Sequence, residues 1–222
     1  DAHAHSDVDI IVIVQRAARD ADLAGWLRPS RMRRGRLVTV AWTTPPMARA
    51  AFRDPERATT FVPGWRDAIV VDDPHGVAAR LKRTAERWTW DGIAPACDAH
   101  VAESITGLAE EAHKLAGLYA AGEYLAAAAQ RDLLAVFLAG TMAVHRRVLF
   151  GTDNVLWDRV GEAMGPAWRR EQRRAFAMRG EPLRTSCRAA LALYAIAARD
   201  AWPLLDREQR AVVRAAMDLR IR

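Results

Sequence analysis

The hydrophobic pattern divides the chain into an early part with short apolar runs and a later part with long amphipathic ones. Asp7 to Val14 (DVDIIVIV) is short, apolar and rich in β-branched residues, which predicts a strand buried on at least one face. Arg36 to Trp42 (RLVTVAW) and Asp67 to Val71 (DAIVV) predict a second and a third strand. Short helices are expected over residues 46–53 and 77–88.

After Trp90 the strand signals cease and helical periodicity takes over. Apolar residues recur at a spacing of three and four over residues 98–121, which predicts an amphipathic helix. The Ala- and Leu-rich segment 123–150 is too apolar all round for a surface element, so we expect it at the centre of a bundle and ended by Gly151. Further helices are expected over residues 154–168, 183–199 and 203–219, separated by glycine and proline.

This order of elements predicts an α+β protein in two domains. Gly92 and Pro95 interrupt the pattern, so the boundary is expected near residues 90–96. Residues 1–92 would form a mixed sheet with helices, and residues 93–222 an all-α helical bundle.

Composition and charge limit the kinds of partner that this protein could bind. The formal charge is +6, from 33 Lys and Arg against 27 Asp and Glu. The arginines of the last third are spread over several helices and interleave with no aromatic platform, which favours a solvated surface over a nucleic-acid groove. No apolar run reaches the length of a membrane-spanning helix. Cys97 and Cys187 lie in apolar helical surroundings, which favours two buried thiols in a cytoplasmic protein over a disulfide.

The first predicted strand carries a pair of carboxylates. Side chains two residues apart in a strand point to the same face, so Asp7 and Asp9 would project side by side. Their mutual repulsion is relieved by a cation, and Mg²⁺ commonly binds one or two carboxylates together with substrate phosphates. Ser6 precedes the pair and could turn the chain or touch a phosphate.

The segment HSDVDIIVIV resembles the second half of the nucleotidyltransferase superfamily signature, in which a Gly-Ser turn precedes [ST]-D-x-[DE] on a strand. The Gly-Ser turn would lie upstream of Asp1, so we expect an N-terminally truncated catalytic domain over residues 1–92. Three later segments, Trp65 to Trp88, Cys97 to Gly117 and Ala139 to Leu156, resemble the closing strand and helix and two bundle helices of kanamycin nucleotidyltransferase-like enzymes.

This resemblance implies a role for each candidate residue. Asp7 and Asp9 would bind Mg²⁺ or Mn²⁺, Glu110 would be the general base, and Ser6 and Lys114 would contact the nucleotide or substrate. Glu111 remains an alternative to Glu110. Enzymes of this type often carry a third acidic residue on the next strand, where this chain has Thr39, so another group would have to supply that ligand. Candidates near strand ends are Asp67, Asp72 and Asp73.

The implied activity is transfer of a nucleoside monophosphate, AMP from ATP, to a hydroxyl of a small acceptor such as an aminoglycoside. The same resemblance suggests a homodimer and a connection with antibiotic resistance. Two alternatives stay open. One is a protein-modifying nucleotidyltransferase of a toxin–antitoxin system. The other is a non-catalytic binding or regulatory protein on the same scaffold, which Thr39 favours.

Overall fold

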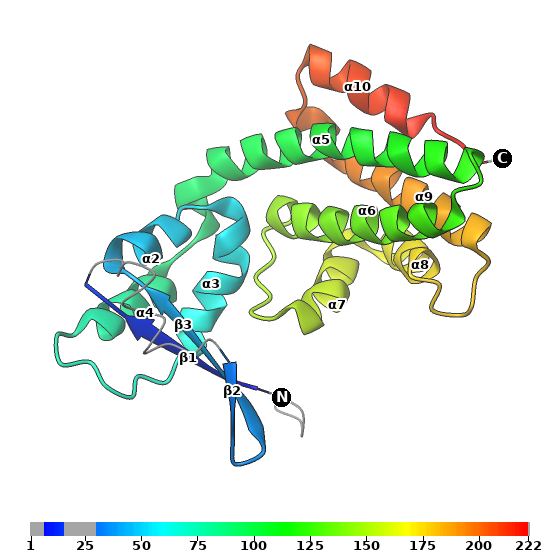
Figure 1. Ribbon diagram of the computed structural model, residues 1–222. Helices are drawn as coiled ribbons and strands as arrows, with labels where there is room; N and C mark the ends of the chain where they lie inside the picture. Colours follow the sequence, from blue (N-terminus) through cyan, green and yellow to red (C-terminus); the bar gives the residue numbers. More distant parts are fainter. Residues whose placement is uncertain (1–6, 16–29, 222) are drawn as a thin grey trace. The chain divides into compact units, whose positions relative to one another are not determined.

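The computed structural model describes residues 7–15 and 30–221. It belongs to the α+β class, with a small mixed sheet near the N-terminus followed by helices (Figure 1). The chain divides into two compact units. The first unit contains residues 1–53 and 65–88, and the second contains residues 54–64 and 89–222. Residues 54–64 therefore belong with the bundle although they lie inside the range 1–92.

The sheet of the first unit has three strands in the order β1-β3-β2. Strand β1 (Val8–Ile13) pairs in parallel with β3 (Arg36–Thr43), and the register runs from Val8 opposite Val38 to Ile13 opposite Thr43. These two strands confirm the two predicted from the β-branched runs at the start of the chain. A sheet with one parallel and one antiparallel pair is mixed.

Strand β2 (Ser30–Arg33) is a strand that the hydrophobic pattern did not predict. It pairs antiparallel with β3 through a two-residue turn at Arg34 and Gly35, whose φ angles are 49° and 77°. Two consecutive positive φ angles are the mark of a type I′ turn, whose twist matches that of a hairpin. The segment SRMR is polar, and Arg34 is an unusual residue at such a position. The hairpin therefore shows neither the apolar alternation nor the common turn dipeptide that would have predicted it.

The expected burial of the first strand was wrong. No residue of β1 is buried, and Ile10 and Ile11 remain 42% and 50% exposed. Among the described strands, β1 lies at the edge of the sheet and has a hydrogen-bonded neighbour on one side only. The buried positions belong instead to the central strand β3, where Val40 and Thr43 are 7% and 8% exposed.

Two short helices of the first unit confirm their predictions and are fixed by side-chain caps. Helix α2 (Pro45–Ala51) begins after Thr44, whose hydroxyl oxygen accepts a hydrogen bond from the Met47 amide at 3.3 Å. Helix α4 (Val77–Arg87) begins after Gly76, and the Asp73 carboxylate three residues before that glycine accepts from the amides of Val77 and Ala79 at 2.7 and 2.9 Å.

The predicted strand over residues 67–71 was wrong. Helix α3 (Pro55–Asp67) ends there, and no strand follows before α4. Ile69 and Val71 are 89% and 93% exposed, so the β-branched run has no partner strand to bury it. A local propensity for strand cannot act without a neighbouring ladder. The backbone carbonyl of Ala68 accepts instead from the Lys82 ammonium at 2.9 Å.

Helix α3 itself was not predicted, and it contains Pro63 in its interior. Proline has no N–H, so the Thr59 carbonyl loses the donor that an α-helix would normally give it. The Phe150 amide donates to that carbonyl at 3.0 Å. The proline thus leaves one carbonyl of α3 free to accept a hydrogen bond from a loop of the second unit. Ala58 and Val62 of α3 are fully buried in that same unit.

The second unit is a bundle in which the expected helices all form. Its elements are η1 (Trp90–Ile93), α5 (Ala94–Ala120), α6 (Tyr124–His145), α7 (Asp153–Met164), α8 (Pro166–Ala175), α9 (Leu183–Ala201), η2 (Trp202–Leu204) and α10 (Arg207–Met217). Several boundaries differ from the prediction. Helix α6 ends at His145 and not at Gly151. The helix expected over residues 154–168 ends at Met164 and is followed by α8, which was not predicted, and α10 begins at Arg207 and not at residue 203. Helix α6 ends before Arg147, because this residue has a left-handed φ of 57° that an α-helix does not allow.

The bundle core lies where α5, α6 and α9 pack together (Figure 1). Its fully buried large side chains are Ile105, Leu115, Leu134, Leu138, Met142, Leu193, Tyr194 and Trp168. The buried Tyr194 hydroxyl donates a hydrogen bond to the Ile105 carbonyl at 3.1 Å, and this bond joins α9 to α5. Cys97 and Cys187 are buried free thiols, as predicted, and burial raises the pKa of each.

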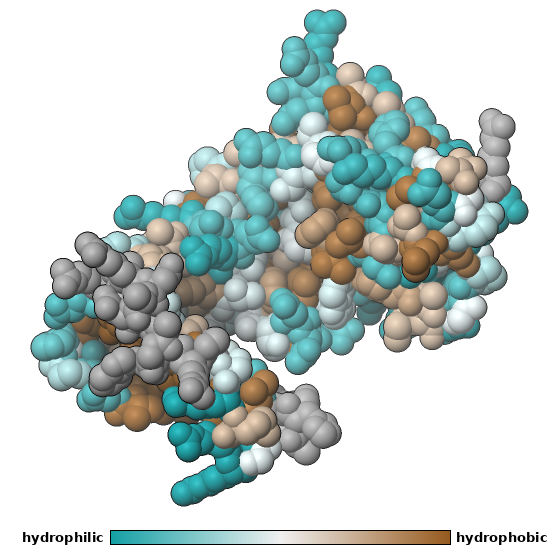
Figure 2. All heavy atoms as spheres, in the orientation of Figure 1, coloured by the Kyte–Doolittle hydropathy of each residue, from teal (hydrophilic) through white to brown (hydrophobic). Residues whose placement is uncertain are grey.

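Helix α6 combines a core side with an exposed apolar stripe. Within the described ranges, it is the helix long and apolar enough to cross a membrane, but 56% of that stretch is buried inside the protein. This burial fits a core helix of a bundle. On its outer side Leu133, Val136 and Phe137 remain 47%, 40% and 51% exposed, and Figure 2 shows hydrophobic surface over this part of the bundle.

Candidate functional site

The paired aspartates lie at the start of the edge strand. Asp7 directly precedes β1, Asp9 is its second residue, and both side chains are exposed. The strand alternation places both carboxylates on one face of the sheet. In the parallel register Asp9 is the neighbour of Thr39, whose side chain shares that face. Ser6, the predicted phosphate contact, lies outside the described residues.

This arrangement offers hard oxygen ligands to a cation. Among residues 7–15 and 30–221, no group of three or more His, Cys, Asp or Glu side chains is placed to bind a metal ion. A cation held by Asp7 and Asp9 could complete its coordination with waters or with the oxygens of a phosphorylated substrate. Mg²⁺ is commonly bound in this way, so the donor set fits Mg²⁺ or Mn²⁺ and does not fit a closed zinc site.

Asp73, a candidate third ligand, already has a structural role. Both of its carboxylate oxygens accept backbone hydrogen bonds at the start of α4. The bond from Ala79 is the largest of several effects that lower the pKa of Asp73. Both oxygens are occupied in this way, so Asp67 and Asp72 are the candidates of this set that no helix start engages.

The predicted base and cation lie together on the outer side of α5. The Lys114 ammonium is 2.9 Å from the nearer oxygen of Glu110, and the two side chains are 48% and 70% exposed. Leu108 and Leu115 on the opposite side are buried, which confirms the amphipathic pattern of this helix. The pair forms one exposed acid–base surface, and its members are one turn apart.

Glu111, the alternative base, is held more tightly than Glu110. It bonds Lys114 at 3.0 Å and accepts a hydrogen bond from Gln130 of α6, and its side chain is only 24% exposed. The bond with Lys114 lowers the pKa of Glu111, while the bonds with Glu110 and Glu111 raise the pKa of Lys114. Lys114 therefore stays charged, and Glu110 is the carboxylate of this cluster that keeps an open side toward solvent.

Gln130 is a residue of this cluster that the sequence did not reveal. It is 9% exposed and comes from a helix 19 residues away along the chain. A buried glutamine in an Ala- and Leu-rich helix was the available signal, because a buried amide requires a polar partner. Its partner on α5 could be identified only from the packing of the two helices.

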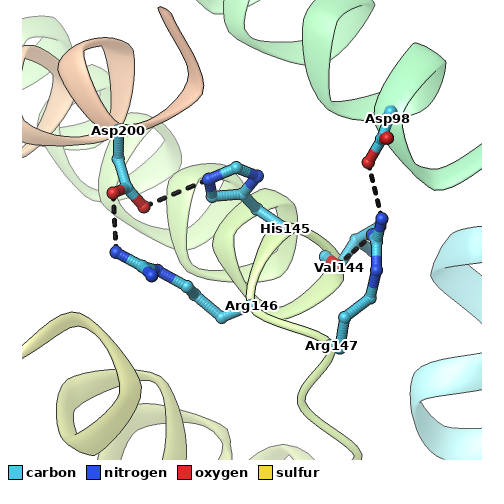
Figure 3. Close-up of polar contacts among 6 residues, drawn as sticks. All are labelled: Asp98, Val144, His145, Arg146, Arg147 and Asp200. Atoms are coloured by element: carbon cyan, nitrogen blue, oxygen red, sulfur yellow. Dashed lines mark hydrogen bonds and ion pairs between the residues drawn. The ribbon is translucent and has the colours of Figure 1, made fainter. Parts of the chain in front are cut away.

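The His-Arg pair at the end of α6 serves the bundle itself (Figure 3). The His145 Nε2 atom lies 3.2 Å from one oxygen of Asp200, and the Arg146 guanidinium lies 2.6 Å from the other. Arg147 binds Asp98 of α5 and also donates to the Val144 carbonyl at 2.8 Å. Because Asp200 and Asp98 occupy these groups within the bundle, the contacts favour a structural role over phosphate binding.

Burial lowers the pKa of His145, and the charges around it act in both directions. Asp200 and Asp98 favour the protonated ring, whereas Arg146 and Arg147 oppose it. The net direction is downward because two guanidiniums offset the carboxylates while the ring loses its hydration. His145 is thus a neutral ring near pH 7.

The candidate residues fall into two groups, one in each unit. Asp7, Asp9 and Thr39 belong to the first unit, whereas Glu110 and Lys114 belong to the second. The structure brings the members of each group together as described above. Comparison with known proteins adds no relative, since no family model, no curated protein and no solved structure matches this chain.

Proposed function

We propose that this protein is a metal-dependent nucleotidyltransferase that transfers AMP from ATP to a hydroxyl of a small acceptor. The observation that carries the proposal is the pair Asp7 and Asp9, exposed on one face at the start of β1. Two adjacent carboxylates without a cation repel each other, and a Mg²⁺–nucleotide complex would remove that repulsion. The segment around the pair also resembles the nucleotidyltransferase signature.

In the proposed reaction the acceptor oxygen attacks the α-phosphorus of ATP and the bond to the β-phosphate oxygen breaks, releasing pyrophosphate. Mg²⁺ or Mn²⁺ bound by Asp7 and Asp9 would offset the charge of the phosphates. Glu110 would take the proton of the acceptor hydroxyl. Lys114 would neutralise charge on the triphosphate or the acceptor, a role that its raised pKa supports.

Two further features of the protein belong to the proposal. The free buried thiols Cys97 and Cys187 are consistent with a cytoplasmic protein. The exposed apolar stripe on α6 offers a surface on which a second copy could pack as a homodimer. An aminoglycoside is the acceptor to test first, because the exposed carboxylates of α5 would suit a cationic amine.

A non-catalytic nucleotide-binding protein is the second candidate, and one observation favours it. The strand register places Thr39 beside Asp9, at the position where a third carboxylate would be expected. A hydroxyl is a neutral and weaker ligand than a carboxylate. Such a protein would bind the Mg²⁺–nucleotide complex without turning it over.

The binding test compares the affinity for Mg²⁺–ATP, measured by calorimetry, in the wild type and in Asp7→Asn/Asp9→Asn. We expect the double substitution to abolish measurable binding and to leave the fold intact, because both residues are exposed. Glu86→Gln is the control, since it removes an exposed carboxylate of the same unit that has no role in the proposed site. Equal affinity in the wild type and in Asp7→Asn/Asp9→Asn would refute the assignment.

The turnover test uses labelled ATP with an aminoglycoside acceptor. Glu110→Gln should slow the chemical step by about 10²-fold or more, the usual contribution of a general base. Glu162→Gln, an exposed carboxylate of α7 in the same unit, should leave the rate unchanged. Label on a protein band would instead indicate a protein-modifying enzyme. Binding of Mg²⁺–ATP without transfer of label to any acceptor would favour the non-catalytic candidate.

A further inference from the structure

A second candidate site lies in the bundle, far along the chain from the aspartate pair. An open pocket of about 400 Å³ is lined by Arg199 of α9, Trp202 of η2, and Arg214 and Met217 of α10. All four residues belong to the second unit. The volume falls within the range of small-molecule sites in proteins.

The pocket carries positive charge that no carboxylate neutralises. Throughout the described parts of the chain, Arg199, Arg210 and Arg214 form no ion pair. Two acidic residues of this region, Asp200 and Asp206, are engaged elsewhere. Asp200 binds His145 and Arg146, and Asp206 accepts from the Gln209 amide at 2.8 Å at the start of α10.

The arginines converge on one aromatic ring. The guanidinium carbons of Arg210 and Arg214 lie 5.7 and 5.4 Å from the centre of the Trp202 ring. Arg210 donates one hydrogen bond to the Trp202 carbonyl, while its Nε atom is buried and has no partner in the described structure. The arginines of this region therefore do surround an aromatic platform, contrary to the expectation from the sequence.

We propose that this pocket binds a small planar aromatic anion, with the ring against Trp202 and Met217 and the charged group at Arg199 and Arg214. Guanidinium groups bind phosphate and carboxylate oxygens strongly, and the thioether of methionine makes favourable contacts with aromatic rings. A single-stranded nucleic acid would require several aromatic platforms along a basic groove. The pocket offers one tryptophan ring, which favours a small ligand. This site is independent of the proposed nucleotidyl transfer.

The test is calorimetric titration of the full chain with 1-naphthyl phosphate in the presence of EDTA. We expect one binding site, with affinity that falls as salt is added. Affinity for 1-naphthol and for inorganic phosphate should be much weaker, because each lacks one half of the ligand. 1-Naphthoate tests whether a carboxylate replaces the phosphate. The variant Asp7→Asn/Asp9→Asn should bind 1-naphthyl phosphate as the wild type does, which separates this site from the proposed nucleotide site.

Two substitutions locate the site. Arg199→Gln and Arg214→Gln should each weaken 1-naphthyl phosphate binding about tenfold or more, the effect of losing a hydrogen bond to a charged group. Both arginines are exposed, so the fold should persist in circular dichroism. Arg207→Gln, an exposed arginine on the same helix outside the pocket lining, is the matched control.

Three results would overturn the proposal. The first is no binding of 1-naphthyl phosphate or 1-naphthoate to the wild type. The second is an equal affinity in Arg214→Gln, Arg199→Gln and Arg207→Gln. The third is displacement of the probe by a single-stranded oligonucleotide that binds more tightly through the same arginines, which would identify a nucleic-acid surface.

Discussion

Arg147 shows how one residue ends a helix and joins two others. Its φ of 57° is costly for a residue with a side chain, so surrounding contacts must hold it. Those contacts are the bonds with Asp98 and the Val144 carbonyl, and the approach of its guanidinium carbon to within 5.9 Å of the Trp90 ring centre. The neighbouring His145 and Arg146 bind Asp200, so the end of α6 is fixed to both α5 and α9.

The lowered pKa of His145 predicts a pH-dependent stability. A histidine whose pKa is lower in the folded than in the unfolded state binds fewer protons when folded, so the free energy of unfolding falls as pH drops through 6.5 and below. The lowered pKa values of Asp73, Glu111 and Glu181 act in a more acidic range, starting from ordinary values of 3.8 and 4.5. Urea unfolding between pH 7.5 and 5 should therefore show a loss of stability that His145→Gln lacks. An identical slope in both proteins would contradict the burial of a neutral ring.

Single residues differ in how far the sequence could reveal them. Asp7 and Asp9 stand two apart in one strand, so their common face followed from the sequence alone. The partners of the α6 end could not be found in this way, because Asp98 and Asp200 are 49 and 54 residues distant from the arginines they bind. Such pairs depend on which helices pack together, and an arginine has many possible carboxylate partners along the chain.

Among the elements, the long helices and strands β1 and β3 were predictable, whereas β2, helix α3 and the segment 67–71 were not. Helices α5 and α9 carry many apolar residues at helical spacing, so each signal is repeated over several turns. The run DAIVV has five residues and no partner strand, and it stays exposed where a strand was expected. Helix α3 was missed because Pro63 and Gly64 interrupt the pattern, although a carbonyl freed by proline is what binds Phe150.

The bond between α9 and α5 gives a prediction for the bundle. Tyr194→Phe removes the hydroxyl that donates to the Ile105 carbonyl inside the core, and burial already raises the pKa of this hydroxyl. We expect the free energy of unfolding to fall by about 1 kcal/mol, the net value of one buried hydrogen bond. Tyr124→Phe is the matched control, because Tyr124 is 56% exposed. Equal denaturation midpoints for the two variants would show that the Tyr194 bond contributes nothing.

In the molecule as a whole, the bundle extends backward along the chain to residues 54–64. This segment contributes the fully buried Ala58 and Val62 and the carbonyl that binds the Phe150 amide. A protein consisting of residues 89–222 should therefore be less stable than one consisting of residues 54–222, by at least about 2 kcal/mol, the value of burying one valine side chain. Chemical denaturation of both fragments measures the difference. Equal stability would mean that the segment is not part of the bundle.

The placement of residues 54–64 also limits how this protein could have been assembled from parts. A recombination event that joins the gene of this bundle to another gene at codon 88 would leave behind the piece of α3 that the bundle contains. The Phe150 amide would then lack its acceptor, and the buried side chains of Ala58 and Val62 would be missing from the bundle. Exchange of the bundle as a module would succeed only with a junction before codon 54, which carries all of α4 and the connecting chain along with it. The two units are thus expected to be inherited together.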